Sequence, residues 1–141
     1  MAQNEYELKK WIEKELIISG GGETLSNILD PIKEDVKNFI RLTKDGNIYL
    51  LPATQELPKY YQIYLYFIGK AYSYVANLSN SDEVTNKELE NNLRLPEGTV
   101  KGSLKVLRES DWIFSLKPGL HKLNYSKLNE AFKTLIESIK K

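Results

Sequence analysis

The fold of this chain is decided by residues 85–123, which read TNKELENNLRLPEGTVKGSLKVLRESDWIFSLKPGLHKL. The opening of this stretch predicts a short helix over residues 86–93, and Thr85 has the kind of side chain that caps helix N-termini. We expect a tight connection at residues 94–95. Pro96 suits the first turn of a second helix, because the missing N–H of proline costs nothing there. The stretch is therefore expected to begin with two short helices separated by a turn.

The second helix is indicated by the spacing of its apolar residues. Val100, Leu104 and Leu107 recur at positions i, i+4 and i+7, which share one side of a helix over residues 96–109. We expect this side to face the core, and the opposite side to face solvent.

A β-hairpin is predicted after this helix, because the period of the pattern changes. Residues 112–116 are rich in aromatic and branched side chains, which favour a strand. Pro118 and Gly119 suit the two central positions of a type II turn, and residues 120–124 are predicted to form the returning strand. Val84, which precedes the first helix, is expected to lie in a short third strand.

Helix, turn, helix and hairpin follow one another here in the order of a winged helix-turn-helix. Residues 58–141 resemble this domain of prokaryotic transcriptional regulators, the archaeal ones most closely. The residues that carry the resemblance are Lys87-Glu88-Leu89, Leu95-Pro96-Glu97-Gly98-Thr99-Val100, Leu104, Leu107 and Asp111-Trp112-Ile113. The resemblance implies that the helix over residues 96–109 enters the major groove of double-stranded DNA. It also implies that the wing, residues 112–124, contacts the DNA backbone.

Residues 1–57 predict an N-terminal subdomain of helices followed by a hairpin. The expected elements are helices over residues 5–18, 24–29 and 31–38 and strands over residues 40–43 and 48–51. Asp30 is expected to cap the third helix, with Pro31 at its first position. Asp45-Gly46 between the two strands is a strong signal for a hairpin turn. The subdomain is either a degenerate second winged helix or a packing unit without a nucleic-acid role, and its acidic second and third helices favour the packing unit.

The chain is thus expected to be mainly α with small β-hairpins, divided at a linker over residues 52–58 that has proline at both ends. The helix that follows, residues 59–78, is the most aromatic segment and is apolar on more than one side. Such a helix is more often buried on several sides than built as an aromatic ligand cage, so its extra face should pack on the N-terminal half or on another copy. The C-terminal helix carries a further apolar stripe that includes Leu128, Phe132 and Leu135. Together these two helices predict a homodimer.

Charge is unevenly distributed along the chain, although the formal net charge is only +1. Residues 1–57 hold seven basic and ten acidic side chains, or −3, whereas the remaining residues hold thirteen and nine, or +4. Seven of the basic residues lie between positions 94 and 127. This excess of positive charge on the two helices and the hairpin favours a nucleic-acid partner.

The expected DNA contacts lie on the side of the helix over residues 96–109 that points away from its apolar residues, and on the wing. Phosphate contacts are assigned to Arg94, Lys101, Lys117 and Lys122, and base-edge contacts to Thr99, Ser103, Lys105 and Arg108. Gly98 and Gly102 lower helix stability, and a useful compensation is close approach of the backbone to a groove. The alternative is a protein–protein interaction module without direct DNA binding, which uses the aromatic helix as its interface.

Several classes of function are disfavoured by the composition. The chain has no cysteine, which excludes disulfides, thiolate chemistry and cysteine-based zinc sites. Its single histidine, His121, has no recognisable nucleophile or base partner, so we interpret it as a surface or sheet residue. We expect no catalytic activity, no metal and no cofactor. The polar first ten residues and the polar side chains within residues 60–78 predict a cytoplasmic protein that does not enter a membrane.

Overall fold

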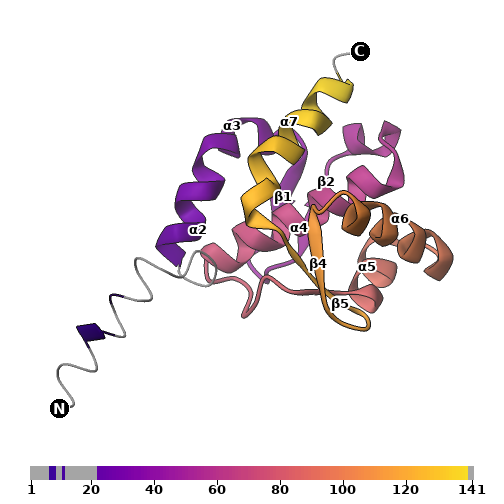
Figure 1. Cartoon of the computed structure of the whole chain (residues 1–141). Helices are drawn as coiled ribbons and strands as arrows, with labels where there is room; N and C mark the ends of the chain where they lie inside the picture. The colour runs from indigo at the N-terminus through magenta and orange to yellow at the C-terminus, as the bar shows by residue number, and fades with distance from the viewer. Residues whose placement is uncertain (1–6, 9–10, 12–21, 140–141) are drawn as a thin grey trace.

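The computed structural model describes residues 7–8, 11 and 22–139, which are mostly helical with two small antiparallel sheets, as expected (Figure 1). The helix predicted over residues 5–18 lies almost entirely outside the described residues. The helices are α2 (Gly22–Leu29), α3 (Lys33–Val36), α4 (Lys59–Val75), α5 (Asn86–Leu93), α6 (Glu97–Glu109) and α7 (Leu128–Ile139), with the 3-10 helices η1 (Asp30–Ile32), η2 (Pro52–Glu56) and η3 (Tyr125–Lys127). The strands are β1 (Ile40–Leu42), β2 (Ile48–Leu50), β3 (Val84–Thr85), β4 (Ile113–Lys117) and β5 (Leu120–Leu123). Strands β1 and β2 pair with each other, and the second sheet has the order β3-β5-β4.

Helix α4 forms the centre of the core. Residues 63–68 are each at most 1% exposed, so this part of the helix is buried on every side. Its neighbours are α2, β1 and β2 from the N-terminal half and α6 and β5 from the C-terminal half (Figure 1). The prediction that this helix is buried on more than one side is confirmed, and its extra face is covered by the N-terminal half. Within the described part of the chain, no helix has the length and apolar character that crossing a membrane requires.

Polar side chains attach α5 to α4. The hydroxyl group of Tyr66 donates to Oε2 of Glu88 at 2.6 Å and accepts from Nδ2 of Asn92 at 2.7 Å. Lys70 also donates to this Glu88 oxygen, at 2.9 Å. A buried polar atom needs a partner to offset its lost hydration, and these hydrogen bonds both satisfy the Tyr66 hydroxyl group and link α5 to α4.

The helices over residues 22–36 have different boundaries from those predicted. Helix α2 begins two residues earlier than expected, and α3 is a single turn that ends two residues earlier. Asp30 does not act as an N-cap, because it is already the first residue of η1. The residue before it, Leu29, is helical, whereas an N-cap residue typically has an extended backbone. Asp30 instead pairs with the side chain of Lys33 at 2.9 Å. The predicted linker over residues 52–58 contains the 3-10 helix η2.

Positive φ angles are found in both predicted hairpin turns and at the predicted connection after α5. Gly46 has φ 86° in the turn between β1 and β2, and Gly119 has φ 80° in the turn between β4 and β5. Other residues rarely adopt this conformation, which is why glycine suits both positions. Arg94 ends α5 in the left-handed conformation, with φ 55°. Both predicted hairpins and the tight connection after α5 are therefore confirmed.

The two helices predicted after residue 85 are both present, and only the first residue of the second helix differs, by one position. Oγ1 of Thr85 accepts a hydrogen bond from the backbone N–H of Glu88 at 3.0 Å, which confirms the predicted N-cap. Pro96 precedes α6 as its N-cap rather than filling its first turn, because its backbone is extended, with ψ 151°. Val84 lies in the short strand β3, as expected, and this strand pairs with β5.

Gly69 provides a test of how closely α4 packs on the β1–β2 hairpin. A Cβ atom at this position would lie 2.6 Å from Cγ2 of Ile48 and 3.3 Å from Cγ2 of Ile40. We expect Gly69→Ala to lower the free energy of unfolding by about 1–3 kcal/mol, because overpacking outweighs the gain in helix propensity. Urea denaturation of the variant and of the wild-type chain measures this difference. A variant as stable as wild type would contradict the close contact.

Candidate nucleic-acid interface

A groove of about 530 Å³ lies between α6 and the β4–β5 hairpin. Its α6 side holds Lys101, Lys105 and Arg108, which recur at positions i, i+4 and i+7 and therefore share one side of the helix. Its hairpin side holds Ser115 and His121, next to the turn. We call this feature, defined by these five residues, the α6–hairpin groove. It collects three of the predicted DNA contacts.

The three cations of the groove form at most weak, exposed ion pairs with other described residues of the chain. Lys101 lies 2.8 Å from Glu97, and both side chains are well exposed. Lys105 lies 4.0 Å from Glu109 in a similarly exposed pair. Arg108 has no ion-pair partner among the described residues. Because exposed pairs of this kind contribute little to stability, a polyanion can readily replace the two glutamates.

Packing within the described part of the chain does not require the two glycines on the exposed side of α6. A Cβ atom added to Gly98 or Gly102 would meet no other atom within 4 Å, and neither residue has a positive φ. A glycine inside a helix costs about 1 kcal/mol relative to alanine, so Gly102 lowers the stability of α6 without an internal benefit. The bare backbone leaves room for an external surface to approach the helix closely.

Three of the four predicted phosphate contacts, Arg94, Lys117 and Lys122, are not among the residues that line the α6–hairpin groove. Lys122 follows His121 in β5, so its side chain points to the opposite face of the sheet. There its Nζ atom lies 3.7 Å from Oδ2 of Asp82, a carboxylate that is only 7% exposed. Arg94 ends α5 and borders a separate pocket beside β2. Neither side chain therefore adds positive charge to the groove.

Ser103, which the sequence assigned to base edges, is buried instead. It follows Val100 by three residues and precedes Leu107 by four, so helical geometry includes it in the apolar face of α6. With 8% of its surface exposed, it cannot reach a nucleic acid. Thr99 is half-buried near the start of α6, and Lys117 is exposed at the end of β4. These two residues keep access to solvent.

His121 is a sheet residue, as expected, but it is buried rather than on the surface. Only 2% of it is exposed, and its Nε2 atom lies 2.6 Å from Oδ1 of Asn86. Because an amide oxygen only accepts, Nε2 carries the proton of the neutral ring, and Nδ1 has no hydrogen-bond partner among the described residues. Burial lowers the pKa of His121, and the positive charge of Arg108 lowers it further. The available sequence signal was the alternation of side chains along a strand, which puts His121 on the same face of β5 as the buried Leu123.

Comparisons of the chain with family models, with curated proteins and with solved structures gave no match. Its function is therefore inferred from the α6–hairpin groove, where three cations lie beside an open helix backbone and a buried neutral imidazole. Such a surface suits a ligand that carries several negative charges.

The buried histidine predicts a pH-dependent stability. Because the pKa of His121 is lowered in the folded chain, the unfolded chain binds the proton more readily below the ordinary pKa of 6.5. We expect the free energy of unfolding to be fully retained above pH 6.5 and to decrease as the pH falls below it. His121→Gln should remove the dependence between about pH 7 and pH 5.5, since the chain has no other histidine. Urea denaturation across this range measures the effect, and an unchanged dependence in the variant would contradict the assignment.

Proposed function

We propose that this chain binds double-stranded DNA as a small transcriptional regulator. In this proposal α5, the turn at Arg94, α6 and the β4–β5 hairpin form a winged helix-turn-helix, and α6 enters the major groove. The order and the ends of these elements support the proposal, since they agree with the pattern on which the resemblance rests. The observation that carries it is the combination of three cations and an open backbone on the exposed side of α6.

The exposed side of α6 has the chemistry that binding in a DNA groove requires. The major groove of B-DNA admits an α-helix and brings both base edges and phosphates within reach of its side chains. We assign Lys105 and Arg108 to base edges, together with Thr99 on the other flank of α6 near its start, and Lys101 and Lys117 to phosphates. The absence of a side chain at Gly102 allows the helix to lie close to the DNA. Each phosphate contact releases condensed counterions, so affinity should fall steeply with salt.

Three residues assigned from the sequence are left out of this interface. Lys122 pairs with a buried carboxylate, Arg94 borders another pocket, and Ser103 lies in the core. The proposed interface is therefore narrower than the sequence suggested. It consists of one side of α6 and the adjacent end of β4.

The same proposal includes a cytoplasmic homodimer. The sequence suggested a dimer because of apolar faces on α4 and α7, but the structure does not favour that reason. Most of the apolar surface of α4 and α7 is covered within the chain, where Phe67 and Leu135 are fully buried, although Ile139 at the end of α7 is 43% exposed. Two copies are instead expected because paired domains of this kind read two-fold-symmetric DNA sites. Sedimentation of the chain with and without DNA measures the number of copies.

A second candidate function, protein binding without DNA contact, is favoured by one observation. Phe114 and Leu116 on strand β4 are 50% and 49% exposed, and β4 lies at the edge of its sheet. Exposed apolar side chains on an edge strand suit a protein partner. The aromatic helix α4 cannot supply this surface, because most of it is buried.

Binding to duplex DNA at several salt concentrations tests the proposal. Fluorescence anisotropy with a random-sequence duplex and with a duplex selected for tight binding separates phosphate contacts from base contacts. We expect Lys101→Gln and Lys117→Gln to weaken binding to both duplexes similarly. Each should also lower the salt slope by about one, because one phosphate is no longer neutralised by the protein. Arg108→Gln should cost about 1–3 kcal/mol on the selected duplex and less on the random one.

Two other lysines serve as controls. Lys133→Gln removes an exposed charge on α7, and Lys122→Gln removes a charge on the opposite face of the hairpin. Both should bind DNA as tightly as wild type, provided that thermal melting shows Lys122→Gln to be folded. If Lys101, Lys117 and Arg108 can all be replaced without loss of affinity, the DNA proposal fails and the exposed surface of β4 becomes the leading candidate.

Gly102→Ala separates stability from binding. Alanine at this open helical position should raise the free energy of unfolding by about 1 kcal/mol. The added methyl group should nevertheless weaken DNA binding, because it occupies the space that the proposed contact requires. Urea denaturation and anisotropy on the same variant measure both effects. If the variant is more stable but binds DNA as tightly as wild type, the DNA does not lie close to α6 at Gly102.

A further inference from the structure

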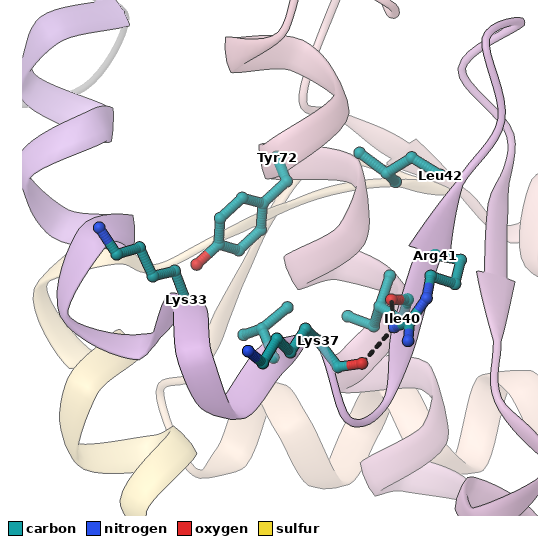
Figure 2. Close-up of a pocket in the computed structure, with 7 residues that line it drawn as sticks. Lys33, Lys37, Ile40, Arg41, Leu42 and Tyr72 are labelled. Atoms are coloured by element: carbon teal, nitrogen blue, oxygen red, sulfur yellow. Dashed lines mark hydrogen bonds between the residues drawn. The ribbon is translucent and has the colours of Figure 1, made fainter.

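A second pocket, of about 540 Å³, lies on the N-terminal half between α3, β1 and α4 (Figure 2). Its apolar wall is formed by Val36, Ile40, Leu42 and the ring of Tyr72. The volume falls within the range of small-molecule sites in proteins. The pocket shares no residue with the α6–hairpin groove, so it is a separate candidate site.

The wall of this pocket is held in place from within the chain. The hydroxyl group of Tyr72 donates to the backbone oxygen of Leu29 at 2.6 Å, and Figure 2 shows it pointing toward the start of α3. Burial raises the pKa of Tyr72 to about 12, so the hydroxyl group keeps its proton. Val36 and Ile40 are themselves almost fully buried. A wall formed before binding lowers the entropic cost of accepting a ligand.

Three cations border the pocket, but Lys33 is paired with Asp30 at 2.9 Å and its amino group points away from the other two in Figure 2. Lys33 and Lys37 extend from α3, and Arg41 extends from β1. The guanidinium group of Arg41 donates to the backbone oxygens of Ile40 and Lys37, so its position is determined by the chain itself. Lys37 lies 2.7 Å from Glu34 in an exposed ion pair, which a ligand can replace.

We propose that this pocket binds a small amphipathic carboxylate, with the alkyl or aryl part on the apolar wall and the carboxylate beside Lys37 and Arg41. An apolar wall alone would accept neutral molecules, and cations alone would attract any anion. Their combination selects molecules that are apolar at one end and negatively charged at the other. The proposal is independent of DNA binding, because different residues carry it.

Titration of the full chain with octanoate, followed by NMR, tests this site, and 1-octanol is the neutral control of equal length. Octanoate should shift the backbone amide signals of residues 33–42 and of Tyr72. It should bind about tenfold more tightly than octanol, because only the carboxylate meets the cations. Hexanoate should bind more weakly than octanoate, since it buries less apolar surface on the wall.

Charge variants locate the carboxylate within the pocket. Lys37→Gln and Arg41→Gln should each weaken octanoate binding about five- to tenfold. Glu34→Gln should strengthen binding, because it removes the carboxylate that competes for Lys37. Lys44→Gln is the matched control, since it removes the same charge from the exposed turn of the β1–β2 hairpin and should leave binding unchanged. Thermal melting without ligand shows whether Arg41→Gln is folded, and Lys37→Gln supplies the test if it is not.

Two results would overturn the proposal. Equal affinities for octanoate and octanol, or equal weakening by Lys44→Gln and Lys37→Gln, would exclude a carboxylate site. An absence of shifts over residues 33–42 at millimolar octanoate would exclude the pocket as a small-molecule site. In that case another part of the chain, or a second copy, would be its natural cover.

Discussion

The burial of α4 on every side is the constraint on which the rest of the structure depends. A helix without a solvent-exposed face must be surrounded by other elements, and both halves of this chain supply them. The β1–β2 hairpin and α2 cover it from the N-terminal half, while α6 and β5 cover it from the C-terminal half. Gly69 lets the hairpin approach closely, and Tyr66 holds α5 through its hydroxyl group. The two halves consequently share one hydrophobic core.

This packing also decides what α6 presents to solvent. Val100, Leu104 and Leu107 are buried on the side of α6 that meets the core, so only the opposite side is free to meet a ligand. The ring of Trp112 lies 5.0 Å from that of Tyr64, which brings the start of the hairpin against the same central helix. The α6–hairpin groove thus results from packing two consecutive elements on α4.

The two pockets place their cations in different surroundings. In the α6–hairpin groove, Lys101 and Lys105 extend from an exposed helix face with an open backbone, which suits an extended polyanion. In the second pocket, Lys37 and Arg41 border an apolar wall that includes the ring of Tyr72, which suits a compact amphipathic anion. Positive charge alone would not distinguish these ligands, because the distinction comes from the apolar surface next to it.

The sequence by itself determined the helices and hairpin of the C-terminal part and the shared side of Lys101, Lys105 and Arg108, because caps, turns and helical periods depend on nearby residues. It misplaced the helix boundaries on either side of Asp30, where the helical conformation of Leu29 overrode the capping signal of Asp30. Only the tertiary structure decided that Lys122 faces Asp82 and that the second pocket exists. Both depend on residues far apart in the sequence, whose contacts are decided by how the elements pack around α4 rather than by any local pattern.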